Sequence, residues 1–228
     1  MSFNGILLID KPAGITSHDV IYKLRKITGI KRIGHTGTLD PMAIGLLVIL
    51  VGSATKSASQ YTNADKEYHA EMVIGIDTDT QDRQGKIVST KDASGLDKKR
   101  IYRSIKRFTK EIEQYPPMYS AVKIGGKKLY QLARQGKIVK RDPRKIIIYN
   151  IEVKSIRLGK YPVVEFSVAC SKGTYIRTLC HDIGKDLGYG AHLSALKRTK
   201  VGNFSLENAV TIKWLENNNP QEAVCLPM

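Results

Sequence analysis

The chain has 228 residues, of which 42% are hydrophobic, and its formal net charge is +16. This length and composition favour a globular fold with a packed core. Its apolar runs, including residues 5–9 and 43–51, are far shorter than the roughly 20 residues of a membrane-spanning helix, and no signal-peptide pattern is present, so we expect a cytoplasmic protein with no membrane partner.

The first half of the chain alternates strand and helix patterns. Residues 5–9 predict a short strand, and a helix follows that Ser17 could cap and Gly29 could end. Residues 43–51 are almost wholly apolar, which is typical of a strand buried on both faces. Residues 66–76 alternate instead, so Tyr68 and every second residue up to Ile76 should share one face of a strand.

The second half begins with a turn at residues 78–85 and a short strand at 85–90. Residues 97–112 then predict a basic helix with an apolar face, and residues 127–135 a second helix. A strand at 164–170, a helix within 173–188 and a last helix at 211–217 complete the pattern. No βαβ period, repeat or linker divides the chain, so we expect one mixed, largely antiparallel α+β domain over residues 1–228.

Much of the positive charge lies in residues 97–145, which hold 16 Lys and Arg residues against 4 Asp and Glu residues, a net +12. The simplest interpretation is the solvated face of a helix, and it fits residues 97–112 locally. It leaves the excess of one sign unexplained, because soluble helices usually intersperse acids with bases. Nucleic acid is therefore the partner we expect.

The cysteines and the usual catalytic motifs indicate little chemistry. Cys170, Cys180 and Cys225 form no CxxC pair and are odd in number, so we expect buried thiols and neither a disulfide framework nor a zinc site. Signatures of nucleotide hydrolases, zinc proteases and serine hydrolases are absent. His181 follows Cys180 directly, but adjacent helical residues do not face each other, so the two do not form a catalytic pair.

The stretch GHTGTLDPMAIGLLVILVG, residues 34–52, places one acid, Asp40, directly before the buried strand. Asp before Pro is typical of a capped turn, so a structural role is the simpler interpretation of Asp40. Gly34 and Gly37, however, permit tight turns among polar and aromatic side chains, and such a loop is able to approach a ligand closely. Asp40 is thus either a structural cap or a reactive group.

Several motifs together resemble the TruB family of tRNA pseudouridine synthases, in unbroken order from about residue 4 to residue 216. They are NGILLIDKPAGITSHDV, GHTGTLDPMAIGLLVI, GSATK, DKEYHAEMVIG, TDTQDRQGKIV, PPMYSAVKIGGKKLYQLARQG, CSKGTYIRTLCHDIG and GAHLSALKRTKVGNF. The resemblance implies the pseudouridine synthase fold, with helices flanking a mixed, mostly antiparallel central sheet and an active-site cleft across that sheet. It implies conversion of the T-loop uridine at position 55 of tRNA to pseudouridine, without a metal or an organic cofactor.

The resemblance also assigns roles to individual residues. Asp40 matches the essential catalytic aspartate, Tyr68 an active-site tyrosine, and Arg177 the arginine that pairs with the aspartate. His35 matches a residue that enters the T-loop near the vacated base. The remaining matches line the pocket or the surrounding cleft and are Tyr175, Leu196, Lys56 and Asp82. Without the resemblance, Tyr68, Tyr175 and Leu196 would be read as ordinary packing residues.

The chemistry explains why a carboxylate suits the reaction. The bond from uracil N1 to ribose C1′ must break and a bond from C5 to C1′ must form, and a carboxylate is able to attack as a nucleophile, stabilise a cationic sugar or take a ribose proton. The uridine must first flip out of its loop, which costs a few kcal/mol of lost stacking. The Tyr68 ring would stack on the flipped base, and its hydroxyl would assist removal of the C5 proton.

The family pattern and this chain differ at the C-terminus. Bacterial members commonly continue into an RNA-binding PUA domain, and this sequence stops about where that domain would begin, so we expect no PUA domain and a weaker grip on the acceptor arm. We expect a monomer with no obligate protein partner. Two alternatives stay open, a noncatalytic RNA-binding protein and a nucleoside N-glycosidase that would release free uracil.

Overall fold

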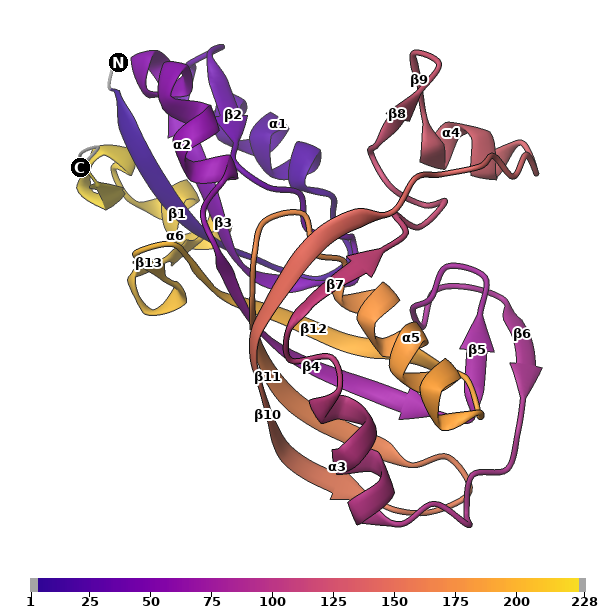
Figure 1. Ribbon diagram of the computed structural model, residues 1–228. Helices are drawn as coiled ribbons and strands as arrows, with labels where there is room; N and C mark the ends of the chain where they lie inside the picture. Colours follow the sequence, from indigo (N-terminus) through magenta and orange to yellow (C-terminus); the bar gives the residue numbers. More distant parts are fainter. Residues whose placement is uncertain (1–3, 226–228) are drawn as a thin grey trace. The chain divides into compact units, whose positions relative to one another are not determined.

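The computed structural model describes residues 4–225, which divide into two compact units (Figure 1). Unit 1 comprises the chain up to His69 and from Leu196 onward, and unit 2 comprises Ala70–Ala195. Two strands, β4 (Lys66–Ile74) and β12 (Ala191–Val201), begin in one unit and end in the other. The fold class is α+β, with a mixed, mostly antiparallel sheet, as predicted.

Unit 1 is built around two long antiparallel strands, β1 (Gly5–Lys11) and β3 (Ile44–Val51), which pair over seven residues from Gly5↔Val51 to Lys11↔Gly45. Seven of the eight β3 residues are buried, which confirms the strand predicted from its continuous apolar run. The other elements of unit 1 are β2 (Ile33–His35), β13 (Phe204–Ser205), β14 (Val210–Thr211), β15 (Val224–Cys225), α1 (Ser17–Thr28), α2 (Ala58–Thr62), α6 (Ile212–Asn217), and the 3₁₀ turns η1 (Gly52–Ser57), η2 (Leu206–Asn208) and η3 (Pro220–Ala223).

Helix α1 begins at Ser17, the residue predicted to be its cap. Its N-cap is Thr16, whose hydroxyl accepts the Asp19 backbone N–H while the Asp19 carboxylate accepts the Thr16 N–H at 2.8 Å. Ser17 is therefore wrong as the cap. The predicted stop is correct, because Gly29 takes the left-handed conformation at φ +71°.

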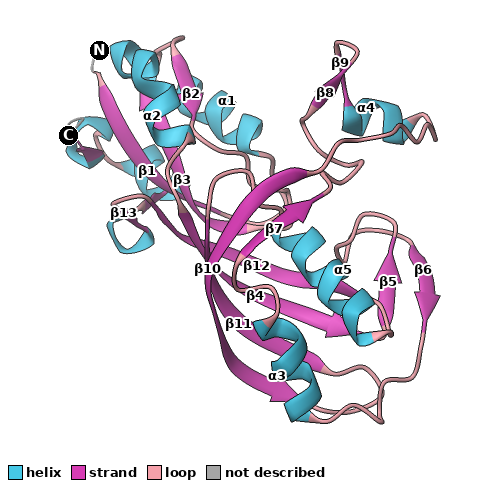
Figure 2. Ribbon diagram, viewed as in Figure 1, coloured by secondary structure: helices cyan, strands magenta, loops and turns pink. Residues whose placement is uncertain are grey.

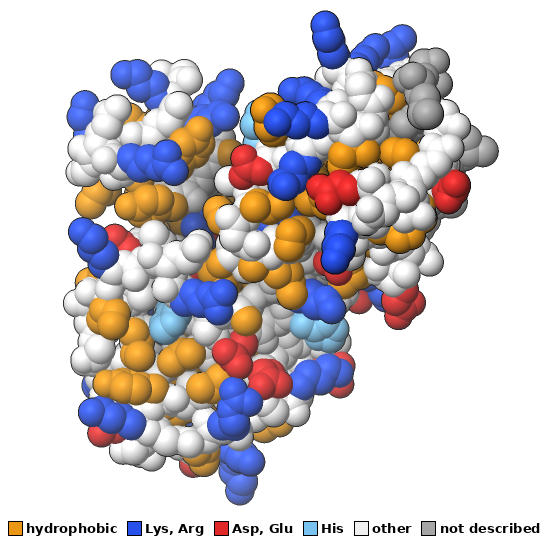
Figure 3. All heavy atoms as spheres, turned by 180° about the vertical axis from the view of Figure 1, so that it is seen from behind, with side chains coloured by type: hydrophobic (Ala, Val, Ile, Leu, Met, Phe, Trp, Pro, Cys, Tyr) orange, Lys and Arg blue, Asp and Glu red, His pale blue; other side chains and the backbone are white. Residues whose placement is uncertain are grey.

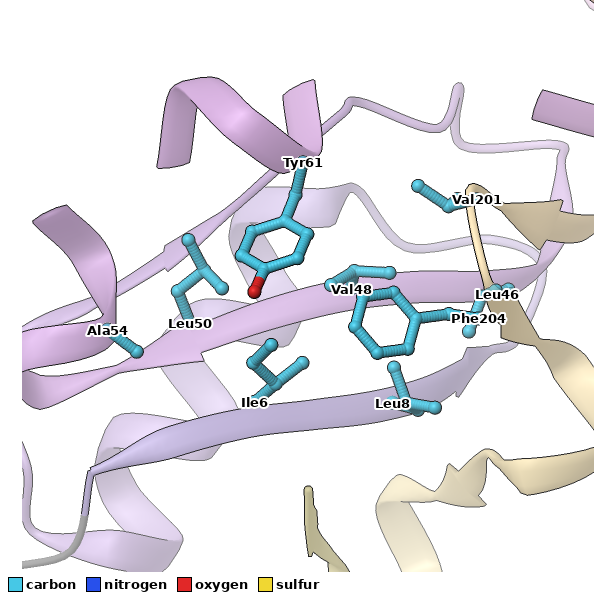
Figure 4. Packing of buried hydrophobic residues seen from close by; sticks show 9 residues of the cluster. All are labelled: Ile6, Leu8, Leu46, Val48, Leu50, Ala54, Tyr61, Val201 and Phe204. Atoms are coloured by element: carbon cyan, nitrogen blue, oxygen red, sulfur yellow. The ribbon is translucent and has the colours of Figure 1, made fainter. Parts of the chain in front are cut away.

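One core cluster of unit 1 forms on a single face of β1 and β3 (Figure 4). Ile6 and Leu8 from β1 contact Leu46, Val48 and Leu50 from β3, and the period of two places all five on that face. The Tyr61 and Phe204 rings cover them, with their centroids 5.6 Å apart. Ala54 and Val201 complete the cluster.

Unit 2 contains the longest strand, β10 (Arg144–Arg157), which pairs antiparallel with β11 (Val163–Cys170) and with β7 (Glu111–Gln114) (Figure 2). The predicted alternation of β11 is confirmed, since its buried residues recur at every second position. The other elements of unit 2 are β5 (Ile76–Thr78), β6 (Ile87–Thr90), β8 (Lys123–Ile124), β9 (Lys127–Lys128), α3 (Lys98–Lys106), α4 (Leu129–Arg134) and α5 (Ile176–Leu187).

Two predicted helices of unit 2 are shorter than expected. The basic helix ends at Lys106 rather than at residue 112, because Ile112 lies in β7 and pairs with Ile146 of β10. The next helix starts at Leu129, because Lys127 and Lys128 form β9 of a small hairpin. In both places a strand partner distant in sequence, or a tight glycine turn, overrides the helical pattern.

Candidate active site

Asp40 lies in the loop of residues 36–43 between β2 and β3, which we call the Asp40 loop. Its side chain is half-buried, and its backbone carbonyl accepts the Ala43 N–H at 3.0 Å in a turn. No helix follows this turn, because β3 begins at Ile44. The structure thus contains the turn expected at Asp40 but no helix that Asp40 would cap.

Hydrogen bonds from β3, from the turn at Gly14 and from α1 hold the backbone of the Asp40 loop. The Thr36 N–H donates to the Val48 carbonyl of β3 at 3.1 Å, and the Pro41 carbonyl accepts the Gly14 N–H at 2.8 Å. The buried Ser17 hydroxyl of α1 contacts Leu39 twice, accepting its N–H at 2.9 Å and donating to its carbonyl at 3.2 Å. The loop thus presents Asp40 from a backbone with little freedom.

Lys11 is a fully buried cation beside this loop, at the end of β1. Its Nζ donates to the carbonyls of Pro12 and Ile15, each at 2.8 Å, and reaches the Pro41 carbonyl at 3.4 Å. Burial lowers the pKa of Lys11 to about 8, the negative charge of Asp40 opposes that shift, and Arg198 adds to it. Sequence reasoning missed Lys11, although a lysine that ends an apolar strand before a proline is a usable signal.

Arg198 of β12 is a second buried cation that sequence reasoning missed. Its Nε donates to the Leu46 carbonyl at 2.7 Å and its Nη2 to the Gly37 carbonyl at 3.1 Å. Its position in a strand with exposed Lys197 and Lys200 gives no hint of burial in the sequence. Only the pairing of β12 with β3 buries it.

His35 ends β2 and is half-buried. Its Nδ1 atom is buried and has no hydrogen-bond partner within residues 4–225. Burial lowers the pKa of His35, and the positive charges of Arg198 and His18 lower it further, so the imidazole is neutral at physiological pH.

The other predicted residues of unit 1 differ in exposure. Tyr68 lies on the buried face of β4 and is 8% exposed. Leu196 is half-buried on β12, and Lys56 is exposed in η1.

In unit 2 the structure brings three predicted residues together. Arg177 and Asp82 are both buried, and Nη1 of the arginine lies 3.7 Å from Oδ2 of the aspartate. The Arg177 Nη2 also donates to the Tyr119 carbonyl at 2.6 Å. The guanidinium lies 5.9 Å from the centroid of the Tyr175 ring. The Gln114 side-chain amide accepts the Tyr175 backbone N–H and donates to the Tyr175 carbonyl.

The remaining chemistry-bearing side chains of unit 2 have structural surroundings. Cys170 and Cys180 are buried thiols, as predicted, and burial raises the pKa of Cys180. The Cys225 side chain lies outside the described part of the chain. His181 interacts with Asp77 at 2.9 Å and not with Cys180. Within the described residues no three His, Cys, Asp or Glu side chains gather as a metal site, and no helix is long and apolar enough to span a membrane.

Comparison with protein families shows to which family the chain belongs. Residues 25–176 match the N-terminal domain of TruB family pseudouridylate synthases, and residues 177–224 match the C-terminal domain of tRNA pseudouridylate synthase B. The chain belongs to the TruB family. It is a tRNA pseudouridine synthase, which is an isomerase.

Relatives and solved structures agree with this family assignment. The tRNA pseudouridine synthase B of Clostridium tetani is 51% identical over 97% of this chain and 75% of its own, and that of Symbiobacterium thermophilum is 49% identical over 93% and 71%. A crystal structure of a Cbf5-Nop10-Gar1 complex matches with 35% identity and a TM-score of 0.71, over 92% of this chain but only 52% of the other. An H/ACA RNP bound to a substrate RNA containing 2′-deoxyuridine matches with 30% identity and a TM-score of 0.70, over 98% of this chain and 59% of the other. The chain thus spans only a little over half of these two solved chains.

Proposed function

We propose that the chain converts the T-loop uridine at position 55 of tRNA to pseudouridine, with Asp40 as the group that reacts at the ribose. The observation that carries this proposal is the Asp40 loop. Its half-buried carboxylate is held by a backbone bonded to β1, β3, α1 and β12, with the buried Lys11 ammonium nearby. A fixed carboxylate in such surroundings is suited to attack or proton transfer at a sugar.

The reaction balances without a co-reactant. The N1–C1′ bond breaks, the detached uracil turns, and the C5–C1′ bond forms; C5 then loses its proton and N1 gains one. Asp40 acts either as the nucleophile at C1′ or as the base at C2′, and both routes need the ionised carboxylate. Asparagine has nearly the same shape but neither the charge nor the nucleophilicity.

The remaining site residues hold the flipped nucleotide in this proposal. The ring of Tyr68 stacks on the uracil and its hydroxyl assists loss of the C5 proton, while Arg177 pairs with Asp40 and keeps it ionised. His35 enters the T-loop in its neutral form. Three residues line the pocket and its surroundings, Tyr175, Leu196 and Asp82, and Lys56 contacts the RNA.

The T-arm of tRNA is the partner in this proposal, bound by a cytoplasmic monomer without an obligate protein partner. Lysine and arginine side chains are spread over the face shown in Figure 3, and nearly all those of residues 97–145 are exposed. Exposed cations are free to contact phosphates. One similar solved structure is described as binding a substrate RNA with 2′-deoxyuridine, which supports RNA uridine as the substrate class.

The decisive experiment is tritium release from T-arm stem-loop RNA labelled at uracil C5. Wild-type protein should release tritium in step with pseudouridine formation, and Asp40→Asn should lower turnover by at least about 10³-fold while leaving folding and RNA binding intact. Asp92→Asn is the matched control, because Asp92 is an exposed turn acid that accepts the Ser94 N–H. Turnover of Asp40→Asn within tenfold of wild type would contradict the proposal.

The two alternatives give other products in the same assay. A noncatalytic RNA-binding protein would bind the stem-loop without releasing tritium. An N-glycosidase would release free uracil and leave an abasic ribose. Chromatography of the RNA digest separates all three outcomes.

A further inference from the structure

Arg198 is the most deeply buried cation of β12, with 1% of its surface exposed. Burying a guanidinium is costly unless its N–H groups are bonded. Two of them donate to backbone carbonyls, Nε to Leu46 at 2.7 Å and Nη2 to Gly37 at 3.1 Å. Both acceptors are neutral, so the bonds fix carbonyl positions rather than neutralise a charge.

These two carbonyls are the ends of one short segment, residues 37–46, and Asp40 lies inside it. A single planar guanidinium therefore fastens the segment at both ends, once at the first turn of the Asp40 loop and once inside β3. Its fork has a fixed geometry, so the separation of the two carbonyls is fixed as well. An ammonium group, with one nitrogen, does not span the same two acceptors in this way.

The backbone of β3 is shaped to admit this arginine. Gly45 pairs with Arg198 in the parallel register between β3 and β12, and its φ is +96°. A Cβ at Gly45 would lie 2.4 Å from the Arg198 carbonyl oxygen and 3.0 Å from its backbone nitrogen, a clash that needs a backbone shift. Glycine at position 45 thus lets β12 approach β3 closely enough for the Arg198 guanidinium to reach the carbonyls of Gly37 and Leu46.

The charge of Arg198 also acts on groups beside the loop. It contributes to the lowered pKa of His35, after burial, and to the lowered pKa of Lys11, after burial and against the opposing effect of Asp40. Both groups lie beside the loop: Lys11 reaches the Pro41 carbonyl, and His35 ends β2 directly before the loop begins.

We propose that Arg198 is a positioning residue for the reaction: by holding the carbonyls of Gly37 and Leu46 it sets the place of Asp40 within the loop. The inference rests on the proposed role of Asp40 and adds a residue that does not touch the substrate. Misplacing a reacting group by about 1 Å costs on the order of 10²-fold in rate. The chemical step should therefore suffer more than RNA binding when Arg198 is changed.

The test measures single-turnover rate and RNA affinity separately, with T-arm stem-loop RNA at saturating protein. Arg198→Met removes both bonds and should lower the rate roughly 30-fold or more, while the Kd stays within about threefold. Arg198→Lys keeps the charge and a single donor nitrogen and should restore part of the rate, to within roughly tenfold of wild type. Lys200→Met is the matched control, since Lys200 is an exposed cation of the same strand, and its rate should equal that of wild type.

Folding is checked by circular dichroism and by a melting temperature above the assay temperature. If Arg198→Met does not fold, Arg198→Lys decides alone, with a reduced rate at unchanged Kd as the expected result. A wild-type rate in a folded Arg198 variant overturns the inference, as does a loss confined to Kd. Failure of the proposed function looks different, because wild-type protein would then release no tritium at all or Asp40→Asn would remain active.

Discussion

The Asp40 loop of unit 1 and the basic segment of residues 123–141 in unit 2 differ in how firmly hydrogen bonds hold them. In the loop, hydrogen bonds from Lys11, Ser17 and Arg198 each fix a particular backbone atom. In the basic segment most Lys and Arg side chains are exposed, and Arg141 alone among them donates a side-chain bond to a distant residue of the described chain, the Pro116 carbonyl at 3.2 Å. A reacting carboxylate needs an accurate position, whereas a phosphate contact needs only a nearby charge.

The comparison predicts that changes at the reacting groups lower the rate of the chemical step and that changes in the basic segment lower affinity. Tyr68→Phe gives the largest effect expected beyond Asp40. It keeps the ring and should keep RNA binding, but turnover should fall by about 10²-fold if the hydroxyl assists C5 deprotonation as proposed. Tyr68→Leu should lose both rate and affinity. Equal turnover of Phe and wild type, measured by tritium release, would remove the hydroxyl from the mechanism.

If the basic segment contacts RNA phosphates, RNA affinity should fall steeply as salt concentration rises. Six phosphate contacts predict a slope of log affinity against log salt of about −4 to −5, between the single-strand and duplex limits. A triple change of Lys123, Lys127 and Lys137 to Glu should flatten the slope and leave the saturated rate unchanged. The check is a Kd series by fluorescence anisotropy from low to high salt. A near-zero slope for wild type would show that these cations are only a solvated face.

Lys11 offers a smaller, pH-dependent test of the loop. Its pKa falls from 10.5 to about 8 on folding, so between these values the unfolded chain binds more protons than the folded chain. Stability from this group therefore rises as pH increases through 8, and between pH 7 and pH 9 the gain is about 1 kcal/mol. Urea unfolding at the two pH values should show this gain for wild type relative to Lys11→Met. A difference that does not change with pH would contradict it.

The smallest expected effect is a change in stability from a substitution in the core of unit 1, away from the Asp40 loop. The Tyr61 hydroxyl is buried in the cluster of Figure 4 and has no hydrogen-bond partner in the described part of the chain. Tyr61→Phe removes that group and keeps the ring, so stability should stay equal or rise by up to about 1 kcal/mol. Turnover should not change. A loss of stability in denaturant unfolding would show that the hydroxyl is bonded in solution.

The periodicity of the sequence determined much of the fold, because local pattern dominates where a segment is long and regular. The continuous apolar run predicted β3, the alternation predicted β4 and β11, and Gly29 marked the end of α1. Pattern failed where a distant partner mattered more. Ile112 continues the helical spacing of residues 97–112 but lies in β7 opposite Ile146, and nothing near Ile112 in the chain announces that partner.

The candidate site divides in the same way. The order of motifs in the sequence identified the family and singled out Asp40, Tyr68 and Arg177, because a motif records which residue types stand at which spacing. It did not reveal what holds Asp40. Arg198 looks like an ordinary surface cation in the sequence, and the position of Lys11 between an apolar strand and a proline says nothing of its contacts. The pairing of β1 and β12 with β3 buries both beside the loop. Burial is a property of strands brought together from distant parts of the chain, so tertiary structure alone decided it.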